Sequence, residues 1–331
     1  MNTLHRPRVL RALAGLAALL SLFFGVLGWY WSRIPERPHV EAVLADYPRA
    51  REVVGGLVTA TLIAEAETLL DKPGGYLSND RLPPGVWLDN MPNWEFGVLT
   101  QVRDLAKALR DRFSRSQSQS TEDPDLALAE PKFNFDNSSW LFPASESEYR
   151  DGIRHLRAYL ARLVDEDQYN AQFYARADNL NFWLATVETR LGSFSQRLAA
   201  SVGQRRPAAL DLAGEVGARR STPTPEEVLV KTSWWELDDV FYEARGYCWA
   251  LLHLLRAVEV DFAAVLERKN ARASLDQIIR ELEGSQTPLR SPVILNGSGF
   301  GLLANHSLTL ASYISRAHAA IIDLRELLAQ G

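Results

Sequence analysis

The sequence predicts an all-α protein in which an N-terminal transmembrane helix is followed by a multi-helix bundle with long ordered loops. Residues 12–31 form an uncharged apolar run. Several later segments repeat apolar residues at alternating steps of four and three, a spacing that places them on one face of a helix. Alternation with a period of two is weak throughout, so strands are at most incidental, and residues 293–295 are the best candidate.

The apolar run at residues 12–31 is long enough to span a membrane. As a helix rising about 1.5 Å per residue, it crosses a hydrocarbon core of about 30 Å. The run ends in Trp-Tyr-Trp, which suits the membrane interface, and the arginines in residues 6–11 favour a cytoplasmic N-terminus. A cleaved signal peptide is the alternative, but bulky residues stand where a small-residue cleavage site would be needed. We therefore expect residues 1–11 in the cytoplasm, residues 32–48 as a juxtamembrane linker, and the remaining body on the far side.

Five regions of the body hold the four-three spacing and each predicts a helix: residues 98–109, 149–163, 173–198, 237–265 and 310–328. A further helix is predicted from about Arg49 to Leu70, because Pro48 suits a first helical turn. A bundle of about six helices follows. Residues 203–223 contain no aromatic residue and indicate a flexible linker, so the bundle has a first half at 49–202 and a second half at 224–331.

Two long loops are predicted within the first half, at residues 71–92 and 114–144. Loops longer than about 12–15 residues are uncommon in compact domains and are often functional or disordered. The second loop begins with the polar, low-complexity stretch SRSQSQS. The first loop combines Tyr76 and Trp87 with turn-forming residues, which indicates a loop that packs and is ordered. It is the stronger candidate for a binding loop.

Charge and motif content argue against several classes of function. The first 35 residues hold four arginines and no acid, which leaves 32 basic and 41 acidic residues and a net charge of −9 for the body. A field of that sign repels phosphates, so nucleic acid is not an expected partner. The six histidines lack the spacing of metal ligands, and we expect neither a metal nor a cofactor. The chain carries no recognisable catalytic motif, which favours a protein that is not an enzyme.

Two single residues remain candidates for chemistry. Cys248 lies on the apolar seam of residues 237–265, where a lone thiol behaves as a small buried hydrophobe. Glu65 follows Val58 and Leu62 on one possible helix face, where burial would perturb its pKa. A second possible face points Glu65 elsewhere, and the sequence leaves the two orientations open.

Two functional hypotheses follow from these observations. The first is a non-catalytic envelope interaction or scaffold module whose ordered loops bind another envelope protein. The alternative is a protein that binds or cleaves cell-wall glycan, because aromatic faces stack on sugars while carboxylates and amides bind hydroxyls. The residues that would form such a binding site are Trp87, Asp89, Asn90, Asn93, Trp94, Glu95 and Trp140. The competing interpretation is that these tryptophans plug one end of the bundle.

Three long phrases of the sequence resemble the bacterial domain of unknown function 2333 family. They are AETLLDKPGGYLSNDRLPPGVWLDNMPNWEFG, FSRSQSQSTEDPDL and FNFDNSSWLFPASESEYRDGI. The resemblance covers most of the chain and implies an N-terminal membrane segment, but it supplies no activity and no catalytic residue. It also implies a Gram-negative bacterium. The expected location is then the inner membrane, as a single-pass protein with its N-terminus in the cytoplasm and its main domain in the periplasm.

Overall fold

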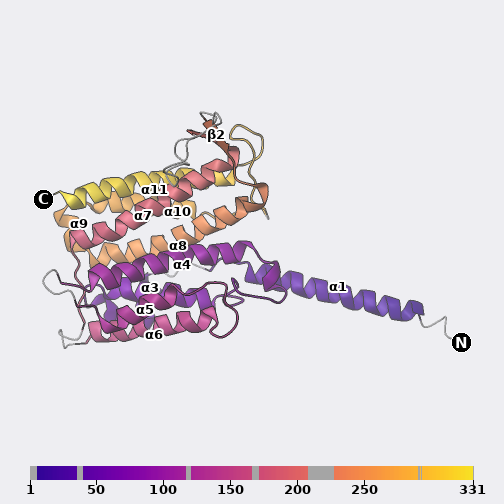
Figure 1. Ribbon diagram of the computed structural model, residues 1–331, viewed down its shortest axis with the longest axis horizontal. Coiled ribbons are helices and arrows are strands. Elements are labelled where there is room, and N and C mark those ends of the chain that lie inside the picture. Colours follow the sequence, from indigo (N-terminus) through magenta and orange to yellow (C-terminus); the bar gives the residue numbers. More distant parts are fainter. Residues whose placement is uncertain are drawn as a thin grey trace, which may run out of the picture.

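The computed structural model describes residues 6–35, 40–116, 121–165, 171–207, 227–289, 291 and 293–330. Helices dominate this part of the chain, as the sequence predicts. Figure 1 shows one long helix, α1, leaving a body of packed helices at one end. The all-α prediction, with one apolar N-terminal helix and a helical bundle, is therefore confirmed.

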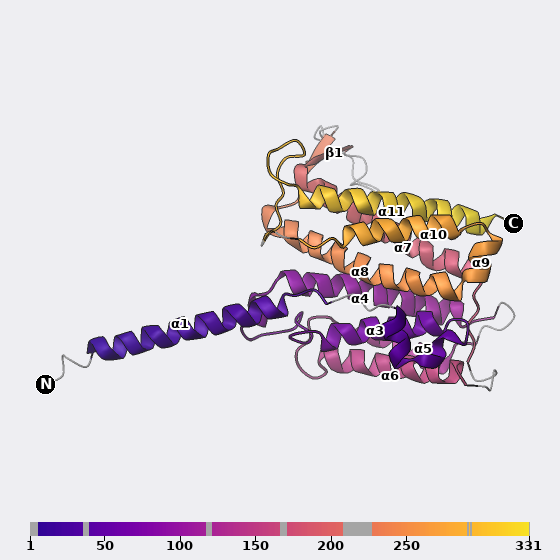
Figure 2. The ribbon, with the colours of Figure 1, turned by 180° about the vertical axis from the view of Figure 1, so that it is seen from behind.

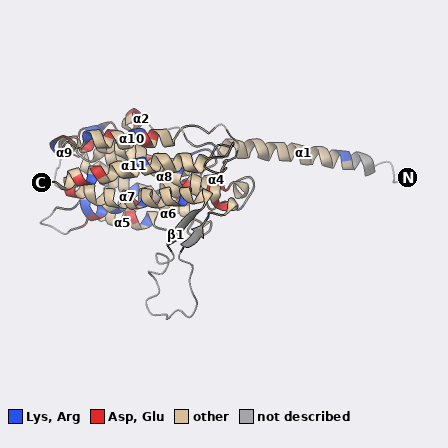
Figure 3. Cartoon of the chain, turned by 90° about the horizontal axis from the view of Figure 1, so that it is seen from above, with Lys and Arg blue, Asp and Glu red and all other residues tan. Residues whose placement is uncertain are grey.

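The first helix, α1 (Arg6–Trp31), extends away from the body. Among the described residues it is the one helix long and apolar enough to cross a membrane, a property that membrane anchors and signal sequences share. In Figure 3 the part of α1 coloured as a basic residue lies near its N-terminal end, and the rest of the coloured helix is uncharged. Most side chains between Leu10 and Leu27 are exposed, and only the last turns of α1 contact the body.

Within the described residues, the body contains eight longer helices. They form two groups of four (Figure 1). The first group comprises α3 (Gly56–Asp71), α4 (Asn90–Ala108), α5 (Pro124–Phe133) and α6 (Ser145–Leu163). The second group comprises α7 (Ala177–Ala199), α8 (Leu237–Asp261), α10 (Arg272–Ser285) and α11 (His306–Ala329). The most extensive contact joins α4 to α8, and Figure 2 shows from the opposite side that α10 lies beside α11 and α8.

Shorter elements connect these helices. Two of them are the short helices α2 (Val40–Asp46) and α9 (Ala263–Arg268). A π-helical turn at Leu109–Phe113 extends α4. Turns of 3-10 helix lie at Pro48–Arg51, Gly85–Trp87, Ala200–Val202 and Trp234–Glu236. A small antiparallel hairpin pairs β1 (Gln204–Pro207) with β2 (Glu227–Val230).

Two glycines allow α4 and α8 to touch along their backbones. A Cβ atom added at Gly97 would lie 2.0 Å from the carbonyl oxygen of Glu243, and one added at Gly246 would lie 2.0 Å from that of Trp94. Beside this crossing the rings of Trp94 and Trp249 meet edge to face, with centroids 5.2 Å apart. Both tryptophans are buried, so the crossing lies in the core that the two groups share.

A carboxylate at the end of α8 makes a second connection between the groups. One oxygen of Asp261 accepts a hydrogen bond from the backbone N–H of Val58 at 2.8 Å, in the first turn of α3. The first amides of a helix have no partner within that helix, and they carry the positive end of its dipole. The last residue of α8 therefore caps α3 across the interface.

The structure corrects several predicted boundaries. Pro48 begins a 3-10 turn instead of a long helix, and α3 starts after Gly55, whose φ of 84° is left-handed. The predicted helix at 237–265 breaks at Phe262, whose buried ring packs against the rings of Phe113 and Phe173. Residues 293–295 form no strand, and the described hairpin lies instead at the two ends of the region around 203–223. Residues 208–226 of that region lie outside the described residues.

Three of the described helices are missing from the sequence prediction, and the shortest of them, α2, lies inside the predicted juxtamembrane linker 32–48. The helix α5 lies inside the predicted loop 114–144 and contains Pro131, a residue that ordinarily argues against a helix. The helix α10 was not predicted because its apolar seam is short. The helix α7 precedes the predicted linker but packs on α11, so the two groups divide the chain before α7 and not at residues 203–223.

Replacing Gly97 or Gly246 by alanine should lower the free energy of unfolding by about 1–3 kcal/mol, because the added methyl group forces two backbones apart. Gly299→Ala is the control, since a Cβ there makes only an ordinary van der Waals contact. Thermal unfolding followed by circular dichroism measures the effect. An unchanged melting temperature for both core variants would contradict the close crossing.

Candidate functional site

The predicted binding loop is ordered by a buried ion pair. The Nζ atom of Lys72 lies 2.5 Å from the Oε1 atom of Glu95, and neither side chain is exposed. The Glu95 carboxylate also accepts hydrogen bonds from the amides of Leu77 and Ser78, at 2.9 and 2.8 Å. Burial raises the pKa of Glu95, while the Lys72 ammonium and these donors act against that rise. Glu95 therefore fixes the start of the loop onto α4.

A second set of contacts ties this loop to the loop between α5 and α6. The hydroxyl of Tyr76 donates to the carbonyl oxygen of Asn137 at 2.9 Å. The side-chain amide of Asn79 donates to the carbonyl oxygen of Ser139 at 2.8 Å and to Glu146 at 2.7 Å. The two loops consequently form one ordered layer at this end of the bundle.

The same loop receives the last turns of α1. The ring of Trp31 lies against Gly74, where a Cβ atom would be 2.7 Å from the ring, and Gly74 has a left-handed φ of 88°. Gly28, three residues before Trp31 on α1, faces the side chains of Pro84 and Leu88. We call this contact between residues 24–31 and residues 72–88 the joint.

Trp87 extends the joint further along α1. Its ring meets the ring of Phe24 edge to face, with centroids 5.9 Å apart. The side chain of Trp87 is nevertheless 63% exposed. Trp87 is therefore part of the contact with α1. The residues around Trp87 in the sequence do not predict this contact.

The seven residues predicted as a binding site do not line one cleft. Trp94 and Glu95 are buried in the core, and Trp140 is 54% exposed on the other loop. Asn93 donates a hydrogen bond to Asp239 of α8 at 2.6 Å. The competing interpretation, in which the tryptophans fill one end of the bundle, agrees with the buried Trp94 but not with the exposed Trp87 and Trp140. Asp89 and Asn90 line one cleft together with residues from elsewhere in the chain.

That cleft, which we call the Asp89 cleft, has a volume of about 240 Å³ and lies between the start of α4, the start of α8 and the loop before α11. Its other walls come from residues outside the predicted binding set: Trp234, Trp235, Leu237, Asp238, Tyr242, Val293, Ile294 and Asn296. Trp234 and Trp235 are 68% and 84% exposed. Two adjacent tryptophans outside any apolar seam are the sequence signal that could have indicated it.

The charge around the Asp89 cleft is negative. Burial raises the pKa of Asp239, and the neighbouring carboxylates Asp238, Asp89 and Glu236 raise it further. Carboxylates beside exposed indole rings suit a cationic side chain, because the ring face and the negative charge both attract a cation. A lysine or arginine from another protein fits this chemistry.

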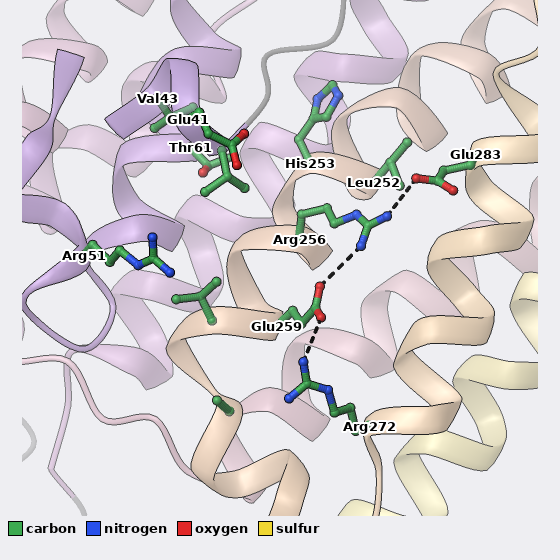
Figure 4. A pocket seen from close by; sticks show the side chains of 13 residues that line it. Glu41, Val43, Arg51, Thr61, Leu252, His253, Arg256, Glu259, Arg272 and Glu283 are labelled. Atoms are coloured by element: carbon green, nitrogen blue, oxygen red, sulfur yellow. Dashed lines mark hydrogen bonds and ion pairs between the residues drawn. The ribbon is translucent and has the colours of Figure 1, made fainter. Parts of the chain in front are cut away.

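A larger cavity of about 610 Å³ lies between α2, α3, α8, α9 and α10 (Figure 4). Its charged wall is a chain of ion pairs in which Arg256 contacts Glu283 at 2.8 Å and Glu259 at 3.4 Å, and Arg272 contacts Glu259 at 3.2 Å. These charges satisfy one another. Thr61 and His253 contribute polar groups to the wall.

The sequence of the chain matches one known protein family. A family described as an uncharacterised protein conserved in bacteria, DUF2333, matches residues 6–331. The chain belongs to the DUF2333 family. Neither the curated proteins nor the solved structures contain a match. In the described part of this DUF2333 protein, no three His, Cys, Asp or Glu side chains are grouped to hold a metal ion.

The two single candidates from the sequence are both buried in this DUF2333 protein. Burial raises the pKa of the Cys248 thiol to about 12, which suits a packing residue. The helix α3 is buried on nearly all sides, so both of the faces considered for Glu65 point into the core. Glu65 lies 3.9 Å from Nδ1 of His253, and its oxygens have no hydrogen-bond partner among the described residues.

Lys72→Met should lower the free energy of unfolding by about 3–5 kcal/mol, because it leaves the Glu95 carboxylate buried without its cation. Lys107→Met is the matched control: its ammonium pairs with Asp111 at the surface, with 62% of its side chain exposed. The control should cost about 1 kcal/mol or less. Denaturant titration measures both variants. Equal costs would show that the buried pair does not hold the loop.

Glu65→Gln should make the protein's stability less sensitive to rising pH. Burial raises the pKa of Glu65 well above its ordinary value, whereas the unfolded chain ionises this group near about 4.3. The folded state therefore holds a proton that the unfolded state has lost, and wild-type stability falls relative to the variant as pH rises above about 4.3.

Melting temperatures of the wild type and Glu65→Gln, compared at several pH values, test this trend. Glu52→Gln, whose side chain is 67% exposed, is the matched control. A difference between wild type and Glu65→Gln that stays constant with pH would contradict a protonated, buried carboxyl group.

Proposed function

We propose that this DUF2333 protein is a non-catalytic, membrane-anchored interaction module of the bacterial envelope. In this proposal α1 spans the inner membrane, residues 1–11 lie in the cytoplasm and the helical body lies in the periplasm. The joint is the observation that carries it. A helix able to cross a membrane contacts an ordered loop of the body, and the Asp89 cleft begins immediately after that loop.

The ends of α1 support the proposed orientation. Arginines cluster before the apolar run, and cytoplasmic flanks are enriched in such residues. At the other end, Trp29 and Trp31 suit the headgroup region, and the guanidinium of Arg33 stacks 4.0 Å from the centre of the Trp29 ring. A body fixed to α1 beside this aromatic end presents the Asp89 cleft close to the membrane surface.

The Asp89 cleft supports a protein partner with a basic segment. Its exposed indoles and its carboxylates attract a lysine or arginine side chain. Since the cleft lies next to the joint, we infer that the partner is another envelope protein that reaches the membrane surface.

The glycan alternative draws on the same cleft, whose indoles, amides and carboxylates also suit a sugar. It is the weaker proposal for this structure. Of the seven residues predicted to bind glycan, Trp94 and Glu95 are buried and only Asp89 and Asn90 reach the cleft.

A photo-crosslinking amino acid at Trp235 in the full chain tests the proposal in cells. It should give a protein adduct of defined size, which Asp89→Asn combined with Asp238→Asn should strongly reduce because the cationic partner loses its attraction. The control position is Ala273, exposed at the opposite end of the bundle. An adduct unaffected by charge removal would contradict the proposed basic partner, and one removed by a muramidase would favour glycan.

The location is tested in the same cells. Alkaline phosphatase fused after Gly331 should be active, because that enzyme needs the oxidising periplasm. An inactive phosphatase fusion beside an active cytoplasmic reporter at the same position would overturn the topology.

A further inference from the structure

Two apolar loops project beside α1 where it leaves the body. We call their six exposed large apolar residues the collar: Leu82, Val86, Trp87, Trp140, Leu141 and Phe142. Phe142 is 99% exposed and Leu82 is 76% exposed. An exposed apolar group of this kind on ordered loops is costly in water, and such patches ordinarily mark a protein or membrane contact.

The joint sets the depth of the first collar loop relative to α1. Trp31 contacts Gly74, whereas Trp87 contacts Phe24. Phe24 precedes Trp31 by seven residues, which corresponds to roughly 10 Å along a helix. If the aromatic end of α1 lies among the lipid headgroups, Trp87 lies deeper than the headgroups, beside the apolar part of the helix.

The second collar loop is held at the same end of the body. Asn79 and Tyr76 bind the backbone of the loop between α5 and α6, which carries Trp140 and Phe142. The helix α6 begins at the same end, because Glu146 in its first turn accepts a hydrogen bond from Asn79. Figure 1 shows that α1 leaves the body at this end. The two loops therefore face the same surface as the joint.

We propose that the collar inserts into the interfacial layer of the lipid leaflet next to the body, as a second membrane contact in addition to α1. This inference rests on the proposed function, in which α1 spans the bilayer. Trp, Phe and Leu are the residues that bury at this depth in interfacial segments. The apolar composition of the collar predicts that insertion does not require anionic lipid.

Lipid is favoured over a protein partner because of the contact between Trp87 and Phe24. A protein covering Trp87 would have to enter the bilayer beside α1, whereas acyl chains already surround that part of a membrane-spanning helix. The Asp89 cleft, by contrast, combines carboxylates with indoles and suits a water-filled interface.

Single-cysteine labelling of the full chain in phosphatidylcholine nanodiscs tests the collar. Cys248 is the single cysteine of the chain and is buried with a raised thiol pKa, so an introduced cysteine is labelled selectively. The test positions are Val86→Cys and Phe142→Cys. The controls are Leu20→Cys within α1 and Ala273→Cys at the far end, both exposed on the protein surface.

Fluorophores at residues 86 and 142 should be quenched several-fold more strongly than one at residue 273 by lipids that carry a quencher near the headgroup. Adding anionic lipid should leave this difference unchanged. Quenchers at the ends of the acyl chains should act most strongly on residue 20.

The two failures are distinguishable. Quenching at residue 20 with none at residues 86 and 142 would refute the collar and leave α1 as an anchor. No quenching at residue 20 would refute the membrane-spanning α1 and the collar with it. Collar labels that are shielded in cell membranes, but remain water-exposed in nanodiscs, would overturn lipid insertion in favour of a protein partner.

Discussion

The buried ion pair between Lys72 and Glu95 links the core of the bundle to the loop that receives α1. Removing two charges from water costs several kcal/mol, and this cost is offset only where the remaining hydrogen-bonding capacity is satisfied. Here Leu77 and Ser78 supply the additional donors, so the pair specifies one path for the loop. That path places Gly74 under Trp31 and, further on, Trp87 beside Phe24.

The position of Glu95 depends in turn on the crossing of α4 and α8. Glu95 lies between Trp94, which packs on Trp249, and Gly97, which touches the backbone of α8. Side chains larger than hydrogen at Gly97 or Gly246 would move α4, and the carboxylate would move with it. A contact between helices in the two groups thus controls the geometry of a loop at the end of the bundle.

The sequence predicts what depends on local periodicity and misses what depends on distant partners. Long apolar seams locate α4, α6, α7, α8 and α11, because repeated core positions leave a readable spacing. The proline in α5 and the short seam of α10 conceal two further helices. In the candidate site, Glu95 looked available for binding because it directly follows Asn93 and Trp94, an amide and an indole that suit a sugar. The ion pair with Lys72 compensates the burial of the Glu95 carboxylate. The sequence spacing of the two residues does not predict this pair.

The loop at residues 72–88 contacts α1 and leads directly into Asp89, so it connects the helix mechanically to the Asp89 cleft. Membrane-spanning helices tilt to match bilayer thickness. If α1 spans the bilayer as proposed, a contact made through Gly28, Trp31 and Phe24 would transmit such a tilt to the body, whereas an inserted collar would oppose the tilt on one side. The orientation of the Asp89 cleft relative to the membrane would then be set by the balance between α1 and the collar. A partner in the same membrane would meet the cleft at a restricted angle, which reduces the orientational entropy lost on binding.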